Sequence, residues 1–343
     1  MKARVLKYAI PLLLYSGVWR SFTNTGWVVW IPVLIAFVMI PILELFIKPS
    51  EDNLTTEEEE MARHDKTYDW LLYMVVPLQY TALYFFLSGI TDAALATSDR
   101  IGRILSMGLI CGIMGINVGH ELGHRVNKTE QTLARMLLLT SLYMHFFIEH
   151  NRGHHKHVGT PEDASSANRN EPLYFFWARS ISGVYMKAWK IALEEQRKKG
   201  RGFLQNEMLH YQLIEFIFCI GIGFYFSWAA LGYFLIAALI GILLLETVNY
   251  IEHYGLKRKP LSNGKYERAM PEHSWNSNHT IGRIMLFELS RHSDHHYLAS
   301  RKYQILRHHD HSPQLPTGYP GSMILAMLPP IWFAVMNKRI DNM

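Results

Sequence analysis

Nine histidines stand in four short segments whose spacing is typical of metal ligands. The segments read HELGH, EHNRGHH, NYIEHYGL and RHSDHH. Side chains three or four residues apart lie on one face of a helix, so His120/His124, His150/His154 and His292/His295/His296 can each direct imidazoles at one point. We predict that all nine bind metal: His120, His124, His150, His154, His155, His253, His292, His295 and His296.

The number and the type of these ligands favour two metal ions and not one. Neutral imidazole is a good ligand for iron, zinc, copper and nickel. A single zinc site uses about three or four protein ligands, which is too few to occupy nine histidines. The chain has two cysteines, Cys111 and Cys219, both in apolar stretches and without a C-x-x-C partner. We therefore expect neither a cysteine-ligated metal nor an iron–sulfur carrier in this chain.

The HELGH segment also matches the H-E-x-x-H pattern of zinc proteases, in which Glu121 would act as the general base. That interpretation uses two histidines and leaves the other seven without a role. A membrane zinc metalloprotease is therefore the less favoured alternative.

Several polar residues adjoin the clusters and are candidates to orient the imidazoles by hydrogen bonds. These second-shell candidates are Glu121, Glu149, Glu252 and Asp294, with Asn276 and His279 in the segment HSWNSNH. The isolated histidines His64, His145, His157 and His210 are expected to bind no metal. A loop or partner-facing role is expected for those in RHHDHSPQLPTG, namely His308, His309 and His311.

The elements that must position the histidines are long apolar segments. A membrane-spanning helix needs about 20 mostly apolar residues. Candidate spans are 8–23, 26–47, 70–90, 101–119 and two within 209–251, joined by a turn near Ser227–Gly232. The sequence therefore predicts an all-α fold, a polytopic membrane helix bundle of about six transmembrane helices.

The distribution of Lys and Arg sets the orientation of this bundle. Nearly all basic residues lie in 1–7, 48–67, 120–208 and 252–343, which the positive-inside rule assigns to the cytoplasm. Both termini are then cytoplasmic, and His120 and His253 emerge on the same side as the other clusters. We predict a histidine-rich cytoplasmic cap that forms the active site. The net charge of +5 comes without a basic stripe interleaved with aromatics, so no nucleic-acid partner is expected.

Taken together, the motifs resemble those of the membrane-bound alkane 1-monooxygenases (alkane omega-hydroxylases), which are relatives of the membrane fatty-acid desaturases and of xylene monooxygenase. The resemblance covers nearly the whole chain. It rests on NVGHELGHR, HFFIEHNRGHHKHVGTPEDA, NYIEHYGL, HSWNSNH, LFELSRHSDHH and LPTGYPG. The forms EHNRGHH and NYIEHYGL favour alkane hydroxylases over desaturases. One departure is Arg125, where the family often has Lys.

The resemblance implies a single integral membrane di-iron hydroxylase domain over residues 1–343. Its two irons would use O2 to hydroxylate the terminal methyl of a medium- or long-chain n-alkane. Electrons would come from rubredoxin, reduced by an NAD(P)H-dependent rubredoxin reductase. The family also implies a multi-pass protein of the inner (plasma) membrane. A fatty-acid desaturase or hydroxylase, or a xylene-type monooxygenase of the same superfamily, remains the alternative.

An apolar substrate is expected to enter from the bilayer and to reach the metals end-on. Bulky residues of the second span are candidates to set the depth of its channel: Trp27, Trp30 and Phe37. For rubredoxin, the basic stretch 187–201 and the segment near Arg307–His311 are the candidate contacts.

Overall fold

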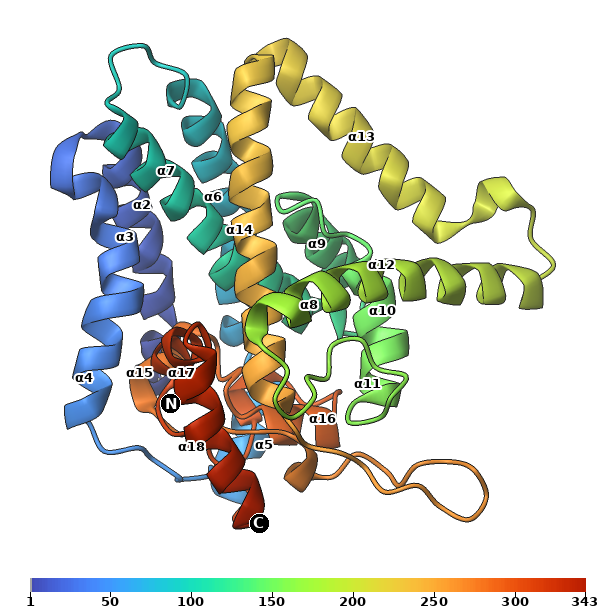
Figure 1. The fold of residues 1–343 in the computed structure, drawn as a ribbon. Helices are drawn as coiled ribbons and strands as arrows, with labels where there is room; N and C mark the ends of the chain where they lie inside the picture. Colours follow the sequence, from blue (N-terminus) through green and yellow to red (C-terminus); the bar gives the residue numbers. More distant parts are fainter. Residues whose placement is uncertain (1) are drawn as a thin grey trace.

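The computed structural model describes residues 2–343 and is built of helices (Figure 1). Within these residues, the β pairing consists of two isolated bridges, Pro260 with Tyr266 and Asn276 with Gln314. The predicted all-α fold is confirmed.

Five helical segments are long and apolar enough to cross a membrane. They are Gly26–Phe46 (η2 Gly26–Trp30, α3 Ile31–Leu34, η3 Ile35–Met39, α4 Ile40–Phe46), Thr67–Gly89 (α6), Thr97–Gly123 (α7 Thr97–Ile110, η4 Cys111–Ile116, α8 Asn117–Gly123), Glu207–Tyr225 (α13) and Trp228–His253 (α14). These segments match the last five predicted spans. The break between α13 and α14 falls at residues 226–227, at the start of the predicted turn.

The first predicted span, 8–23, is helical but is not among these five segments. Residues 2–23 form α1 (Lys2–Leu6), η1 (Lys7–Leu13) and α2 (Leu14–Thr23). Lys7 and Arg20 lower the hydropathy of this helix, because charged side chains are costly in a bilayer. The sixth candidate span is a different one, α17 (Tyr319–Ala326) with α18 (Pro329–Asp341), which are bent by 120° at their junction.

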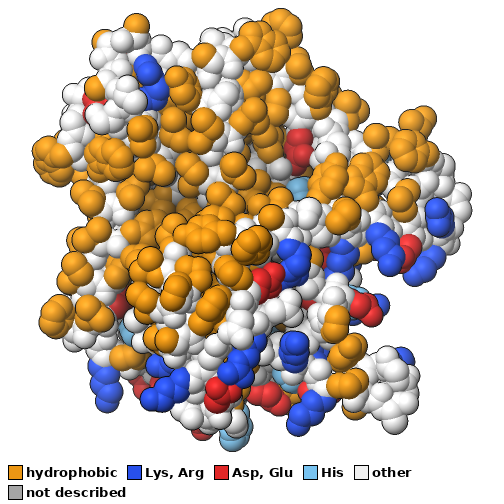
Figure 2. Space-filling view, viewed as in Figure 1, with side chains coloured by type: hydrophobic (Ala, Val, Ile, Leu, Met, Phe, Trp, Pro, Cys, Tyr) orange, Lys and Arg blue, Asp and Glu red, His pale blue; other side chains and the backbone are white. Residues whose placement is uncertain are grey.

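Further helices make up most of the rest of the structure. They are α5 (Thr56–His64), α9 (Lys128–Leu139), α10 (Phe146–Glu149), η5 (His150–His154), α11 (His155–His157), α12 (Leu173–Lys198), η6 (Phe203–Gln205), η7 (Pro271–His273), α15 (Thr280–Met285), α16 (His292–Tyr297) and η8 (Tyr303–Ile305). Figure 2 shows hydrophobic side chains around the spans and charged side chains gathered at the lower end of the view, where α5, α16 and the C-terminus lie in Figure 1.

The segment Thr97–Gly123 is the central helix of the bundle, and 78% of its most apolar window is buried. It packs closely along α14 because glycines remove side chains from the contact. A Cβ at Gly108 would lie 2.6 Å from the Cβ of Ile240, and one at Gly241 would lie 2.7 Å from the Cβ of Cys111. Small residues permit this close approach of two membrane helices. As a result, His120 and His253 end neighbouring helices at the same end of the bundle.

Candidate metal centre

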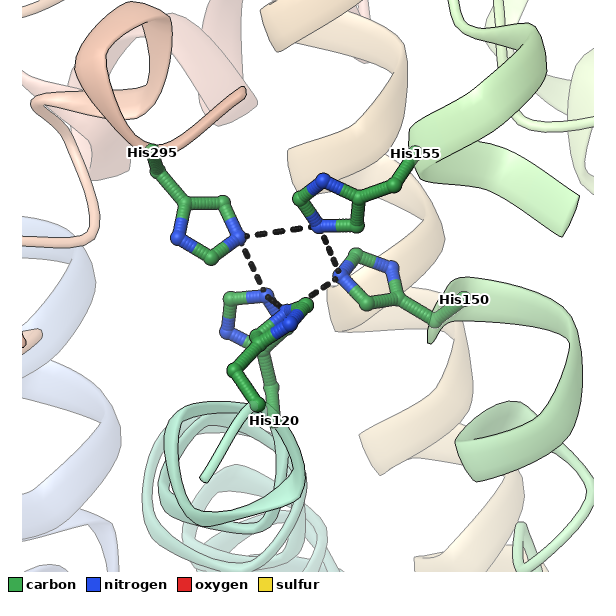
Figure 3. Close-up of side chains that lie close together, drawn as sticks. His120, His150, His155 and His295 are labelled. Carbon is green, nitrogen blue, oxygen red and sulfur yellow. Dashed lines mark hydrogen bonds between the residues drawn. The ribbon is translucent and has the colours of Figure 1, made fainter. Parts of the chain in front are cut away.

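The first histidine group contains five imidazoles whose Nε2 atoms form a closed ring (Figure 3). Around the ring, the Nε2–Nε2 distances are 3.0 Å for His120–His295, 3.1 Å for His295–His155, 3.0 Å for His155–His150, 3.1 Å for His150–His124 and 3.2 Å for His124–His120. His124 and His155 are partly exposed, and the other three are buried.

The second group contains the remaining four predicted ligands, His154, His253, His292 and His296, all of them buried. The Nε2 atoms of His253 and His292 are 3.1 Å apart, and those of His154 and His296 are 3.2 Å apart. The nine histidines singled out in the sequence therefore meet in two groups.

The spacing within each group fits a metal ion better than hydrogen bonds. A neutral imidazole nitrogen offers either one proton or one lone pair, yet each Nε2 of the first group has two other Nε2 atoms within 3.2 Å. Metal–imidazole bonds of about 2.1 Å place adjacent ligand atoms about 3.0 Å apart when they meet at right angles. Both groups are therefore able to bind metal ions.

The pairing expected for His150 and His154 is wrong, because the two residues belong to different groups. Residues His150–His154 form the π-helix η5, whose hydrogen bonds run from residue i to i+5. In this helix, His150 shares a face with His155, and both contribute to the first group, while His154 turns toward the second. The α16 cluster is divided in the same way, since His295 joins the first group and His292 and His296 join the second.

Asp163 is the residue at this site that the sequence reasoning missed. Its Oδ2 lies 2.9 Å from Nδ1 of His154, and both side chains are buried. Burial alone would raise the pKa of Asp163, but the neighbouring His154 and Lys187 hold it well below its ordinary value. Asp163 lies in the segment GTPEDA directly after the second cluster, and helical spacing gave no reason to single it out because turns and bends connect it to His154.

Among the carboxylates that were predicted to orient the imidazoles, Glu252 lies beside a ligand nitrogen of the second group. Its Oε2 lies 3.2 Å from Nε2 of His292, and its Oε1 accepts a hydrogen bond of 2.7 Å from the Tyr319 hydroxyl. Glu149 instead lies 3.0 Å from Nζ of Lys187.

The other second-shell candidates have different partners. Glu121 accepts hydrogen bonds from Arg125 and from the backbone N–H of Tyr303. Asp294 is bound by Arg301, by His309 and by the backbone N–H of Arg307. Asn276 accepts a hydrogen bond of 2.8 Å from the backbone N–H of Ser293 and so fixes the start of α16, and His279 contacts Ser277.

The isolated histidines lie outside both groups, as expected. His145 is buried and packs against Tyr143 and Tyr185. The polar contacts of the others are His64 with Glu60, His157 with Glu162, His210 with the carbonyl of Leu204, His308 with Asn278 and His309 with Asp294.

An apolar cavity lies among the spans. Its walls come from η3, η4, α14, α15 and α17, and include Phe37, Ile113, Leu244, Leu286 and Met323. Two polar residues also line it. Asn117 lies one turn before His120, and Tyr319 donates to Glu252, which contacts His292. Of the three bulky residues expected to set a channel's depth, Phe37 lines this cavity, whereas Trp27 is 72% exposed and neither Trp27 nor Trp30 lines it.

Several known proteins are similar to this chain in sequence. The protein family described as "Fatty acid desaturase" matches residues 101–323. Alkane 1-monooxygenase 2 of Pseudomonas aeruginosa is 40% identical over 96% of this chain and 88% of its own length. Alkane 1-monooxygenase of Acinetobacter baylyi is 38% identical over 90% of this chain and 76% of its own length. The hydroxylase component of xylene/toluene monooxygenase from Pseudomonas putida is 27% identical, over 96% of this chain and 87% of its own length. The chain therefore belongs to the alkane 1-monooxygenase family of membrane oxidoreductases, within the fatty acid desaturase superfamily.

Proposed function

We propose that this enzyme uses O2 to hydroxylate the terminal methyl of medium- or long-chain n-alkanes at two iron ions, with electrons from rubredoxin. The observation that carries the proposal is the pair of histidine groups able to bind metal, together with an apolar cavity between the spans whose wall includes Tyr319, the hydrogen-bond partner of Glu252. The relatives named alkane 1-monooxygenase support the reaction.

Each histidine group would hold one iron. His120, His124, His150, His155 and His295 provide five nitrogen ligands for the first iron, and His154, His253, His292 and His296 provide four for the second. Glu252 would complete the second set, because its distance of 3.2 Å from Nε2 of His292 matches the spacing of adjacent ligands within the groups. The irons, when bound, supply the activation of O2 and accept the electrons that this reaction needs.

The chain's own residues would bind and orient the alkane. The apolar walls of the cavity would replace the lipid chains around an alkane that enters from the bilayer, and would keep the alkane out of contact with water. Asn117, one helical turn before His120, and Tyr319, which donates to Glu252 beside His292, lie on the cavity wall. The methyl end of the substrate would therefore lie between these two residues. Asp163 would keep the proton of His154 on Nδ1 and leave Nε2 free for iron.

The electron donor would be an acidic protein that docks on the charged end of the bundle. In the predicted docking stretch 187–201, Lys187 forms an ion pair with Glu149. The side chains of Lys190, Arg197 and Lys198 on α12 are exposed. In the other candidate segment, Arg307 is paired with Glu59. The exposed end of α12 is therefore the better candidate. Electrostatic docking weakens as salt rises, so turnover with soluble rubredoxin should fall between low and moderate ionic strength.

For orientation, we propose both termini and the histidine groups on the cytoplasmic side of the inner membrane, in one domain that spans residues 1–343. The basic residues at the charged end of the bundle support this orientation. Labelling of single cysteines introduced at Lys265 and at Asp92 in intact cells tests it, because the two residues lie in segments assigned to opposite sides.

The central experiment combines metal analysis with product analysis. Purified enzyme should contain two irons per chain, one for each histidine group. With rubredoxin, its reductase and n-octane or n-hexadecane under 18O2, it should yield 1-alkanol carrying 18O. Zinc as the sole metal in fully active enzyme would exclude the di-iron proposal. Formation of unsaturated fatty acids without any alkanol would favour the desaturase alternative.

A further inference from the structure

A second cavity, polar and separate from the histidine groups, lies where the N-terminal helix meets the segment that leads into α16. Its volume is about 230 Å³, several times the space that one water molecule occupies in the liquid, which is about 30 Å³. The walls come from η1, the loop 50–54, α15 and residues 288–291. Figure 1 shows the N-terminus beside α15. We call this space the Lys7–Arg291 cavity.

Positive charge exceeds negative charge in the walls of the Lys7–Arg291 cavity. Four cationic side chains, Arg4, Lys7, Arg283 and Arg291, face two carboxylates, Asp52 and Glu288. Outside these walls, Arg4 has its own partner in Glu58 at 2.8 Å.

Of the two carboxylates, the buried Glu288 is the one that contacts the other three cations. Its carboxylate lies 2.7 Å from Arg283, 3.3 Å from Lys7 and 3.9 Å from Arg291. One carboxylate therefore balances only part of the charge around it.

Arg291 has a donor that no protein group uses. Its guanidinium donates to the backbone carbonyls of Leu306 and Asp52, at 2.7 Å each, and to Oδ1 of Asn53 at 3.3 Å. Its Nε lies 3.9 Å from Oε2 of Glu288, too far for a hydrogen bond, and has no hydrogen-bond partner within the described structure. The side chain is only 3% exposed. A buried cationic donor without a partner is costly. A further negative charge in the cavity would relieve this imbalance.

Exposed apolar side chains lie close in the chain to residues that line the cavity. Leu6 and Leu13, on the same helix as Lys7, are 67% and 66% exposed, and Phe46 at the end of α4 is 83% exposed. Such a surface suits acyl chains, and basic pockets at the ends of membrane helices bind lipid headgroups. The surroundings therefore favour a ligand with an anionic head and apolar tails.

We propose that the Lys7–Arg291 cavity binds a phosphate group, and that its source is the headgroup of an anionic phospholipid. The phosphate oxygens would accept hydrogen bonds from Lys7 and Arg4, which both line the cavity, and the buried Arg283 and Arg291 would add positive charge behind them. The site adjoins the chain that carries the metal ligands, because Arg291 directly precedes His292. Phe287 and Glu288, just before it, have left-handed backbones with φ of 50° and 59°. This conformation is strained for residues other than glycine. A bound phosphate would therefore stabilise the strained segment that leads into α16.

The test is thermal unfolding of the full-length protein in nanodiscs, which does not depend on the proposed reaction. Discs of phosphatidylcholine alone are compared with discs that also contain phosphatidylglycerol. We expect phosphatidylglycerol to raise the Tm of the wild type, because a ligand of the native state stabilises it. The rise should be mostly lost in Lys7→Gln and in Arg4→Gln. It should be kept in Lys7→Arg and in the control Lys128→Gln, which changes an exposed lysine at the start of α9.

A second arm distinguishes the two sources of phosphate. Inorganic phosphate is added to the phosphatidylcholine discs, and sodium chloride of the same ionic strength serves as its control. A rise in Tm with inorganic phosphate but none with phosphatidylglycerol would keep the phosphate site and overturn the lipid as its source. Equal rises with sodium chloride, or an undiminished phosphatidylglycerol effect in both Lys7→Gln and Arg4→Gln, would overturn the site itself.

Discussion

The Nδ1 atom of His154 lies 2.9 Å from Oδ2 of Asp163, inside the protein and away from solvent. The same Oδ2 accepts a hydrogen bond of 2.6 Å from Ser166, so the carboxylate is held from two directions. A carboxylate at Nδ1 fixes the imidazole proton there and turns the lone pair of Nε2 toward the second group.

Asp163→Asn should weaken metal binding more than it destabilises the fold. An amide can present its N–H instead of an oxygen to Nδ1, and the loss of such partners lowers metal affinity by about 10- to 100-fold. Iron retention during competition with a chelator measures the effect. Glu162→Gln is the matched control, because the Glu162 side chain is 66% exposed and contacts His157 instead. Equal iron retention in the two variants would count against the orienting role.

His253→Ala should reduce the iron content and remove hydroxylation while the protein still inserts and folds. The His253 imidazole is fully buried in the second group, 3.1 Å from His292. His145→Ala should keep both irons, because His145 is equally a buried histidine but lies outside both groups. Iron analysis and turnover of the two purified variants check this pair of expectations. Two irons and wild-type turnover in His253→Ala would refute the nine-histidine assignment.

Phe37→Ala should shift the preferred substrate toward longer alkanes. Phe37 lines the apolar cavity, and replacing its ring by a methyl group enlarges the space available to the alkane. The ratio of turnover for n-hexadecane to that for n-octane is the measurement, and it should rise. Trp27→Ala removes an aromatic ring from the same span but outside the cavity, where the side chain is 72% exposed. A similar shift in both variants would mean that the cavity does not measure chain length.

Glu288 should make the protein sensitive to acid. Burial opposes its ionisation, but Arg283, Lys7 and Arg291 outweigh burial and lower its pKa from 4.5 to about 2. A lowered carboxylate pKa stabilises the folded state fully above pH 4.5, and this contribution, on the order of 3 kcal/mol, is lost as the pH falls toward 2.

Thermal unfolding of wild type and Glu288→Gln between pH 7 and pH 3 tests this expectation. The variant should be less stable at pH 7, and the difference in Tm should narrow below pH 4.5, where Glu288 of the unfolded wild type takes up a proton while the folded protein keeps it ionised down to about pH 2. Glu57→Gln, at an exposed position on α5, should follow the wild type throughout. A difference in Tm that does not change with pH would show that Glu288 stabilises the fold by its packing and not by its charge.

Local sequence patterns were enough to identify the nine clustered histidines and the last five spans. Residues three or four apart share a helix face, and apolar runs of span length have few other stable environments, so both signals can be read without knowing what the segments contact. The first span was the exception. The stretch 8–23 is helical, but with Lys7 and Arg20 at its ends the helix is not among the segments long and apolar enough to cross a membrane.

Only the tertiary structure decided how the histidines divide between the two groups. The π-helix at His150–His154 turns the side chain of His154 away from that of His150. In α16, His295 belongs to one group and His292 to the other. The contact of Asp163 with His154 and the approach of Glu252 to His292 also depend on how segments far apart in the chain pack together. The sequence by itself determined which residue types gather at the end of the bundle. Which atoms face one another was decided by packing, because a hydrogen-bond register that shifts by one residue redirects every side chain that follows it.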